Sequence, residues 1–588
     1  MSHLNDTYAL LRAFAQELVR CGMRAACTSP GSRSAPLVLS LAREPGLRCY
    51  SHVDERCAGF FALGMAKATG LPVAVACTSG TAAAQLHAAA VEAREARVPL
   101  LLLTADRPAE LREVGAGQAI DQLGIYGSAA KWFFEVSVDE AGDRELRWMR
   151  TLACRAYWTA LEGRPGAVHL NFPLREPLVG ELALPDDDTP RPGGAPYVSR
   201  PAATLVAGQD ELAGLVGGAR RGVLVAGRHE RATPLGAAAA AFARAAGWPL
   251  LADPMSGARR GEAAVAHYDA LLRDGSFAAA HSPDLVLRVG DLPVSKPLRA
   301  WLASLPGVAQ VALDPDGAWQ DPDSALSHSF ALEPAAALAA LTAGGVAPPT
   351  ADAEWLARWR GADARAGAAI AAVLGGRLSE PAVAAALGAL LPADATLFVA
   401  SSMPVRDIET FWPARDDPPR VLCNRGANGI DGTVSSAFGA AAASAGPVVL
   451  LIGDVALAHD LGGLLAAGRL GLALTIVLVD NGGGGIFDFL PVAGSGAARA
   501  AEPNAVAPGQ EDIYTRHVAT PTGIDFAAAA AAFGIEHEPA GDSAELRLAL
   551  ERSLAAGATR VVHVRSERAA NVELHREVWS AVATALSR

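Results

Sequence analysis

Two short apolar runs in the last third of the chain each end in polar residues. Residues 447–452 and 474–479 consist almost entirely of apolar and β-branched side chains, which is typical of strands covered on both faces. The intervening residues 455–468 are rich in Ala and Leu, have the length of a helix and end in Gly468. A strand, a helix and a parallel strand need roughly 30 residues, which is the length available here. The pattern therefore predicts a strand–helix–strand unit with parallel strands.

Alternating strand and helix patterns with short connections extend along the rest of the chain and predict an α/β protein. Two breaks rich in Pro, Gly and polar residues, 186–194 and 344–349, divide the chain into three such parts. We predict three doubly wound parallel-sheet domains at residues 1–185, 195–345 and 353–588. The patterned elements of the first two domains are a helix at 7–21 and strands at 48–53, 73–77, 99–104, 222–227, 284–289 and 308–313.

The composition limits the classes of protein that the chain can represent. Its formal net charge of -12 argues against a nucleic-acid-binding surface, which normally carries a basic stripe. The 7 cysteines include no CxxC pair, so we expect buried thiols in a reducing cytosol and neither a disulfide framework nor a zinc site. No run reaches the roughly 18–20 apolar residues of a membrane span, and the N-terminus lacks a signal-peptide pattern. We expect a cytoplasmic protein.

Polar residues follow both predicted strands of the third domain. Asp454 comes after Gly453 at the end of the first strand, and Asn481 follows the second. Because the carboxyl ends of parallel strands meet at one edge of a sheet, these oxygen donors lie where α/β sheets bind ligands. With the backbone carbonyl of Gly483 they suit Mg²⁺, which takes its other ligands from water and phosphate. Taken singly, Gly-Asp and Asn-Gly are also ordinary turn sequences, but at this spacing they favour a metal-bridged diphosphate site.

Further motifs occur in a fixed order in the first and third domains. They lie at residues 27–36, 51–56, 78–81, 104–112, 115–119, 401–407 (SSMPVRD) and 424–432 (NRGANGIDG). Together with Gly-Asp and Asn they resemble thiamine-diphosphate enzymes, and closely resemble the 2-succinyl-5-enolpyruvyl-6-hydroxy-3-cyclohexene-1-carboxylate (SEPHCHC) synthase family, MenD. The resemblance extends over about residues 28–491 and is thin in the second domain. It implies a pyrimidine-binding, a central Rossmann-like and a diphosphate-binding domain in the pyruvate-oxidase/decarboxylase-like arrangement.

The resemblance also implies an activity and an assembly. Members of this family use thiamine diphosphate with Mg²⁺ or Mn²⁺. They decarboxylate 2-oxoglutarate and add the resulting succinyl-semialdehyde carbanion to isochorismate in a 1,4-addition, releasing CO₂. In the superfamily the active site lies between two subunits, so the expected assembly is a homodimer, with a homotetramer as the alternative.

Two residues of this chain match the family's catalytic positions. Glu55 matches the glutamate that hydrogen-bonds the aminopyrimidine ring, a role that benefits from a water-poor site. The alternative for residues 54–56 is a solvated turn with an ion pair. Ile430 matches the bulky side chain that holds the cofactor bent, and its alternative is ordinary core packing. The glycines at 429 and 432 favour a tight loop.

Substrates that carry three carboxylates need cations, and Arg side chains bind carboxylates in a bidentate manner. A single arginine is more often part of a surface ion pair, but four within Gly-, Pro- and Ser-rich loops are not explained in that way. The resemblance implies metal ligation by Asp454, Asn481 and Gly483, cofactor contacts from Glu55, Ser402, Arg425, Gly429, Ile430, Gly453, Asp454 and Asn481, and substrate contacts from Ser32, Arg33, Arg107, Gln118, Lys296, Ser402, Arg406 and Arg425.

The chain departs from the family pattern at two positions. Pro297 stands where some members have an arginine, which puts one substrate contact in doubt unless Arg299 compensates. Ala456 stands where a serine or threonine is common, so one hydroxyl contact to the diphosphate is in doubt. Backbone amides at a helix N-terminus provide an alternative contact.

Other functions remain as alternatives. Another thiamine-dependent 2-oxo acid decarboxylase or an acetohydroxyacid synthase would share the cofactor residues, but its small neutral acceptor does not need the arginines. A catalytically silent binding protein has no need to retain Glu55, Asp454 and Asn481.

Two further segments have expected roles. For residues 222–227 a scaffold role is favoured over FAD binding. Residues 495–520 are expected to form an active-site loop or lid.

Overall fold

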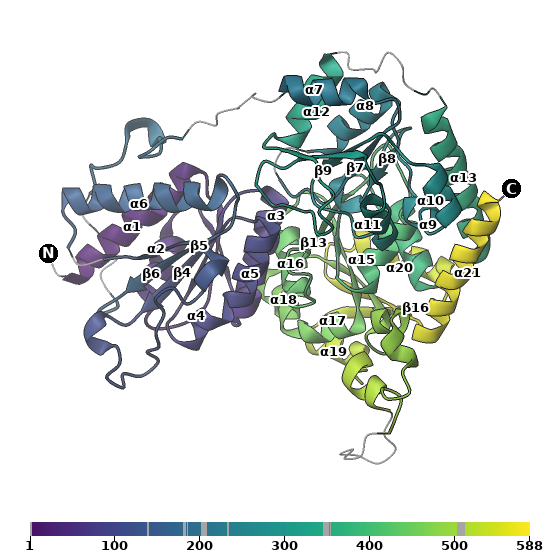
Figure 1. Ribbon diagram of the computed structural model, residues 1–588. Helices are drawn as coiled ribbons and strands as arrows, with labels where there is room; N and C mark the ends of the chain where they lie inside the picture. Colours follow the sequence, from purple (N-terminus) through teal and green to yellow (C-terminus); the bar gives the residue numbers. More distant parts are fainter. Residues whose placement is uncertain are drawn as a thin grey trace. The chain divides into compact units, whose positions relative to one another are not determined.

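The computed structural model describes residues 3–137, 140–179, 184, 186–200, 209–231, 234–344, 352, 354–501 and 512–587. Within these residues the chain forms three β-sheets whose neighbouring strands are parallel and which are flanked by helices (Figure 1). The predicted α/β class with three parallel-sheet domains is confirmed. The domain boundaries stay predictions.

The first sheet is formed by the N-terminal part of the chain. Its strands are β1 (Ala25–Thr28), β2 (Arg48–Ser51), β3 (Val73–Cys77), β4 (Leu100–Asp106), β5 (Ala130–Glu135) and β6 (Ala167–Pro173), and its helices are α1 (His3–Cys21), α2 (Ala35–Arg43), α3 (Glu55–Thr69), α4 (Thr81–Gln85), α5 (His87–Ala96) and α6 (Asp143–Leu161). The strand order is β2-β1-β3-β4-β6-β5. Alternate strand residues such as Ala26, Leu101 and Val168 pack with α1, α2 and α6 in one apolar cluster. Helices α3 and α5 contact the same sheet from its other side (Figure 1).

The second sheet has the order β11-β10-β9-β7-β8. Its strands are β7 (Gly222–Ala226), β8 (Leu250–Ala252), β9 (Leu285–Val289), β10 (Ala309–Leu313) and β11 (His328–Phe330), and its helices are α7 (Gln209–Gly218), α8 (Gly236–Ala246), α9 (Tyr268–Leu271), α10 (Gly275–Ala280), α11 (Lys296–Ala303), α12 (Pro334–Ala343) and α13 (Trp355–Leu374). The strands predicted at 222–227, 284–289 and 308–313 are confirmed to within one residue at each end.

The third sheet has the order β13-β12-β14-β15-β17-β16. Its strands are β12 (Thr396–Val399), β13 (Arg420–Cys423), β14 (Val448–Gly453), β15 (Thr475–Asp480), β16 (Glu536–Ala540) and β17 (Arg560–Arg565), and the helices of this part are α14 (Glu380–Leu390), α15 (Met403–Phe411), α16 (Thr433–Ala443), α17 (Asp454–His459), α18 (Leu465–Leu470), α19 (Phe526–Ala532), α20 (Ser543–Ala555) and α21 (Arg568–Leu586). The two strands predicted from the apolar runs are β14 and β15, and they pair in parallel.

The chain divides into two compact units that cut across the order of the sequence. Unit 1 consists of residues 1–203, 424–444 and 460–472, and unit 2 of residues 204–423, 445–459 and 473–588. In unit 1, helix α16 packs along α3 (Figure 1). In unit 2, one apolar cluster joins strands of the second and third sheets, such as β9 at Val286 and β14 at Val449, through Trp355 and Trp359 of α13.

The single helix predicted at 455–468 is wrong. Helix α17 ends at His459, a 3-10 turn follows at Leu461–Leu464, and α18 continues through Gly468 to end before Gly471. The break lies at Asp460, whose fully buried carboxylate accepts a hydrogen bond of 2.7 Å from the Ser435 amide near the start of α16. A long-range contact within unit 1 therefore interrupts a locally favourable helical sequence.

The predicted linkers have different outcomes. Residues 186–194 are held against α6, because Arg150 lies 2.6 Å from Asp187 and 3.1 Å from Thr189; their role as a linker between domains stays a prediction. Residues 345–349 of the second predicted linker and residues 502–511 of the predicted lid lie outside the described residues. None of the helices in the described part of the chain is long and apolar enough to cross a membrane.

Candidate active site

Glu55 is the first residue of α3, directly after the N-cap Asp54, whose carboxylate accepts hydrogen bonds from the Arg56 and Cys57 amides. The side chain of Glu55 is half-buried and forms no ion pair among the described residues, while the neighbouring Arg56 lies 3.7 Å from Asp460; the role of Glu55 stays a prediction. Burial, and then the charge of Asp54, raise the pKa of Glu55 above its usual range, against a smaller lowering by its own backbone amide. Such a carboxyl group is suited to hold a proton and release it again.

The loop that contains Arg425, Gly429 and Ile430 is fastened to α5 within unit 1. Glu92, which is 3% exposed, accepts hydrogen bonds from the Gly426 amide at 2.9 Å and the Ala427 amide at 2.7 Å. Buried Lys67 lies 3.4 Å from the same carboxylate. Sequence reasoning did not find Glu92, because its loop partners lie more than 300 positions away along the chain.

Ile430 is half-buried and does not belong to the buried apolar core of the described residues. Gly432 follows it with φ +61°, and a Cβ there would lie 1.9 Å from the ring of Phe60. The glycine is therefore required by both its backbone conformation and its close packing. This arrangement favours the wedge interpretation of Ile430 over ordinary core packing, and the role itself stays a prediction.

Two of the predicted arginines lie near each other in unit 1. Arg33 is 7% exposed and donates to the Leu174 carbonyl at 2.8 Å and to Glu176 at 3.1 Å, while its Nε is buried without a partner. Arg107 donates to Ser79 Oγ at 2.7 Å and to the Gly117 carbonyl at 2.8 Å. Burial, and then the charge of Arg33, lower the pKa of Arg107. A pair of guanidinium groups held mainly by neutral acceptors is suited to bind an anion.

Gln118 joins the same group through Ser79. Its Nε2 donates to the Ser79 carbonyl at 2.8 Å, and Ser79 Oγ donates to the Gln118 carbonyl at 3.0 Å. Ser79 thus connects Arg107 with Gln118, although the sequence analysis used its motif only for the resemblance. Ser32 is exposed on the neighbouring loop, in which a Cβ at Gly31 would meet Thr78 at 2.3 Å.

The predicted metal ligands meet at one edge of the third sheet in unit 2. Gly453 of β14 pairs with Val479 of β15, so the two strands end side by side. Asp454 is 2% exposed and its Oδ2 has no hydrogen-bond partner, and the same holds for the buried Oδ1 of Asn481. Burial, and then the charge of Asp480, raise the pKa of Asp454 to about 6. Two unpaired buried oxygens at the ends of adjacent strands fit a hard divalent cation.

Gly483, the third predicted ligand, has φ +136°, and a Cβ there would lie 2.5 Å from the Ala519 carbonyl oxygen. Its amide faces the Asp454 carboxylate, and its carbonyl accepts a hydrogen bond of 2.9 Å from the Gly485 amide. A carbonyl oxygen has two lone pairs, so this contact leaves one for a metal.

The remaining predicted residues of unit 2 form no single group. Ser402 has φ +76° at the start of α15, and its carbonyl accepts a hydrogen bond from Arg406. Lys296 is the exposed first residue of α11, and no described contact joins it to Ser402 or Arg406. Arg299 donates to the Pro293 carbonyl at 2.9 Å, and its compensation for the cation that is missing at Pro297 stays a prediction.

Comparison with known proteins relates these sites to named domains. Residues 9–125 match the thiamine pyrophosphate enzyme N-terminal TPP binding domain, residues 194–399 the middle domain of thiamine pyrophosphate, and residues 405–564 the thiamine pyrophosphate enzyme C-terminal TPP binding domain. The chain is 44% identical over 585 residues to the SEPHCHC synthase of Geobacillus kaustophilus, with 98% of each chain covered. It is 42% identical to the synthase of Chloroflexus aurantiacus, with 100% of this chain and 98% of the relative covered. The corresponding values for Rubrobacter xylanophilus are 42%, 96% and 97%.

This chain belongs to the SEPHCHC synthase family. The resemblance predicted from the motifs is therefore confirmed, and it extends over the middle domain, where the motifs are thin. The N-terminal match of this family member contains Arg33, Glu55 and Arg107, and the C-terminal match contains Asp454 and Asn481. The roles of the individual residues stay predictions.

Beside the predicted metal ligand Asn481 of this SEPHCHC synthase family member lies a buried acidic group that the sequence motifs did not reveal. Glu380, the first residue of α14, accepts a hydrogen bond of 2.9 Å from Asn481 Nδ2. Burial, and then the charge of Asp407, raise the pKa of Glu380 to about 7. Asp407 in turn contacts His575 Nε2 at 3.1 Å. Glu380 precedes Asn481 by 101 positions and lies in no motif, so only the tertiary structure connects them.

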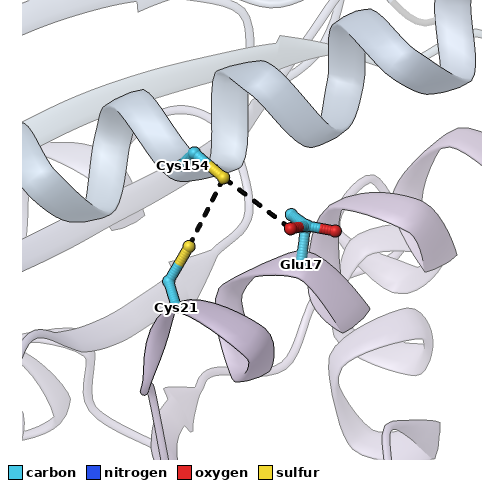
Figure 2. A group of neighbouring side chains, drawn as sticks. All are labelled: Glu17, Cys21 and Cys154. Atoms are coloured by element: carbon cyan, nitrogen blue, oxygen red, sulfur yellow. Dashed lines mark hydrogen bonds between the residues drawn. The ribbon is translucent and has the colours of Figure 1, made fainter. Parts of the chain in front are cut away.

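A second buried polar cluster belongs to the packing of α1 against α6. Figure 2 shows Cys21 and Cys154 with their sulfurs 3.5 Å apart, and Cys154 3.7 Å from Glu17. Arg150 neutralises Glu17 at 3.0 Å. Within the described residues this is the single group of three His, Cys, Asp or Glu side chains close enough to hold a metal. The prediction of free, mostly buried thiols is confirmed, with Cys49 half-buried.

Proposed function

We propose that this protein is a SEPHCHC synthase of menaquinone biosynthesis. In this reaction 2-oxoglutarate is decarboxylated and its succinyl-semialdehyde unit is added to isochorismate in a 1,4-addition, with release of CO₂. The observation that carries the proposal is the pair of unpaired buried oxygens, Asp454 Oδ2 and Asn481 Oδ1, at the ends of adjacent strands in a chain of this family.

The cofactors of the proposal are thiamine diphosphate and Mg²⁺ or Mn²⁺. Asp454, Asn481 and the Gly483 carbonyl would hold the metal, and the backbone at the start of α17 would contact the diphosphate. When bound, thiamine diphosphate supplies a nucleophilic carbon and an electron sink. Ala456, which is 5% exposed, offers no hydroxyl group, so the diphosphate contact rests on backbone amides.

The protein's own contribution is to hold protons and carboxylates in place. Glu55 would hold a proton on its carboxyl group against the pyrimidine ring, which its raised pKa favours. Arg33 and Arg107, with Gln118, would bind substrate carboxylates through charge-assisted hydrogen bonds. Ser32, Lys296, Ser402, Arg406 and Arg425 are proposed as further substrate contacts, with Ile430 supporting the bent cofactor.

The proposed assembly is a homodimer with the active site at the subunit interface, with a homotetramer as the alternative. The resemblance to thiamine-diphosphate enzymes supports this, and light scattering of the purified protein tests it. We also propose that the enzyme works in the cytoplasm.

The test is isochorismate consumption by purified protein with 2-oxoglutarate, thiamine diphosphate and Mg²⁺, omitting each component in turn. Loss of isochorismate that needs all components, with matching CO₂ release, is the expected result. CO₂ release from other 2-oxo acids without any need for isochorismate would assign the protein to the decarboxylases instead. Cofactor binding without turnover would indicate a silent binding protein.

A further inference from the structure

Glu380 lies directly behind the amide that is proposed to ligate the metal. It is 4% exposed at the start of α14, and its Oε1 accepts hydrogen bonds from Asn481 Nδ2 at 2.9 Å and from Ser566 Oγ at 3.1 Å. The other end of the same amide, Asn481 Oδ1, is buried without a partner. The amide is therefore fixed at its nitrogen and unpaired at its oxygen.

The chemistry of the two groups makes this orientation specific. An asparagine amide donates at one end and accepts at the other, and Glu380 Oε1 already accepts from both Asn481 Nδ2 and Ser566 Oγ, so this oxygen presents an acceptor to the amide. Glu380 therefore stabilises the orientation in which Nδ2 faces it and opposes the flipped orientation, in which two oxygens would face each other. A divalent cation needs the oxygen end, so the orientation that Glu380 selects is the one that a metal site requires.

The surroundings of Glu380 are difficult to explain by packing alone. Asp407 lies close enough for its charge to disfavour ionisation of Glu380, and both side chains are at most 4% exposed. His575, also 4% exposed, contacts Asp407 at 3.1 Å. Burying carboxylates costs free energy that an apolar side chain of similar size avoids. Groups kept at such a cost are concentrated at functional sites.

We propose that Glu380 is a positioning residue that orients the Asn481 amide so that Oδ1 faces the divalent cation. This inference rests on the proposed function, because it requires a metal at Asp454 and Asn481. Glu380 acts through Asn481 and touches neither the metal nor the substrate.

The experiment measures metal binding rather than turnover. Mn²⁺ binding is followed by electron paramagnetic resonance at a fixed excess of thiamine diphosphate, and the Mg²⁺ concentration for half of the thermal shift is measured in parallel. The variants are Glu380→Gln, Asn481→Asp and the double variant. The matched control is Glu409→Gln, which changes another carboxylate of unit 2, 2% exposed and near Arg259 and Tyr268.

Glu380→Gln replaces a carboxyl oxygen pair by an amide that can present either its oxygen or its NH₂ group, so the selection of one Asn481 orientation is lost. Disturbing an outer hydrogen-bond partner of a metal ligand typically weakens metal affinity by about 10- to 100-fold, which is the loss expected here. Glu409→Gln should change the melting temperature without this loss. In the double variant the hydrogen bond is reversed, with an amide donating to a carboxylate, so metal binding should recover relative to either single variant. Recovery of this kind would not arise from a merely structural role.

The possible results separate a failure of the proposed function from a failure of the positioning role of Glu380. If wild-type protein binds no Mn²⁺ with thiamine diphosphate, the proposed function fails. If wild type binds and Glu380→Gln binds equally well, the positioning role fails while the metal site stands. If Glu380→Gln does not fold, the comparison of Asn481→Asp with the double variant decides, and equal or weaker binding by the double variant overturns the inference.

Discussion

In unit 1 the arginines Arg33 and Arg107 present hydrogen-bond donors, whereas at the edge of the third sheet in unit 2 Asp454 and Asn481 present acceptors. Arg33 and Arg107 are held by carbonyls, a hydroxyl group and one exposed carboxylate, and Arg33 Nε remains buried and unpaired. At the edge of the third sheet the unpaired atoms are instead oxygens, on Asp454 and Asn481. Each set lacks a partner of the opposite kind.

Burial shifts the pKa of an arginine in unit 1 and the pKa of a carboxylate in unit 2 in opposite directions. Burial lowers the pKa of Arg107 and raises that of Asp454, so each charged form is disfavoured before a ligand arrives. An anion relieves the cost in unit 1 and a cation relieves it in unit 2. A substrate with carboxylates and a metal-bound diphosphate are the two kinds of ligand that this division fits.

The largest effect is expected for Glu55→Gln, which keeps the size of the side chain but removes its proton transfer. Loss of a general acid–base group typically costs about 10²- to 10⁴-fold in rate, so turnover should fall by this amount. Thiamine diphosphate affinity should stay within a few-fold, measured by calorimetry. Glu95→Gln, at a half-exposed position on α5, is the control. Full turnover by Glu55→Gln at ordinary cofactor levels would remove Glu55 from the mechanism.

The next effect tests unit 2. Asp454→Asn removes the charge of a metal ligand, so the thermal shift produced by Mg²⁺ with thiamine diphosphate should disappear, with half-saturation moved by roughly 100-fold or more as charged contacts of this kind are lost. Asp417→Asn, which changes an exposed carboxylate, should leave the shift unchanged. An unchanged shift in Asp454→Asn would show that the metal binds elsewhere.

A smaller effect is expected for Arg107→Ala in unit 1. Hydrogen bonds to charged groups contribute about 1.5–3 kcal/mol, so KM for a carboxylate substrate should rise by roughly 10- to 150-fold. Mg²⁺ half-saturation should not change, because the proposed metal ligands Asp454 and Asn481 belong to unit 2. Arg147→Ala, on the exposed face of α6, is the control. If Arg107→Ala weakened Mg²⁺ binding as much as it raised KM for the carboxylate substrate, the arginines of unit 1 and the acceptors of unit 2 would not act separately.

The smallest expected effect is on stability in the cofactor-free protein. Lowering the pH should destabilise the surroundings of two buried histidines in unit 1 and stabilise the surroundings of two buried carboxyl groups in unit 2. Burial lowers the pKa of His52 to about 4 and of His169 to about 3 in unit 1, so their contribution to stability is present above the usual value of 6.5 and is lost as the pH falls below it. In unit 2 the pKa values of Asp454 and Glu380 are raised to about 6 and about 7, so their contribution is present at low pH and is lost as the pH rises through these values.

Hydrogen exchange measured by mass spectrometry at pH 7.5 and 5.5, corrected for intrinsic rates, should therefore show less protection around His169 in β6 and more around Asp454 at the end of β14 at the lower pH. The variants His169→Gln and Asp454→Asn should each reduce the response of their own segment. A response of the same sign in both segments would contradict the prediction.

The strands and the cofactor motif could be predicted from the sequence because both depend on neighbouring residues. Residues 448–453 and 475–480 form strands where continuous apolar runs predict them, and parallel pairing alone is enough to bring Asp454 and Asn481 to one edge. The helix predicted at 455–468 failed because Asp460 is used by Ser435, a contact that no local pattern contains. Lys296 was predicted from the resemblance and Arg299 as compensation for Pro297, and only the structure shows that Arg299 donates to the Pro293 carbonyl.

The sequence by itself determined the α/β class, the parallel sheets, the edge where Asp454 and Asn481 meet and the family. These follow from short-range periodicity and from motifs whose residues lie close together along the chain. Only the tertiary structure decided that Glu92 fastens the loop of Arg425, that Ser79 joins Arg107 to Gln118 and that Glu380 holds the Asn481 amide. The physical reason is that a hydrogen bond between residues 101 or 334 positions apart depends on how the elements pack, and packing leaves no periodic signal in the sequence.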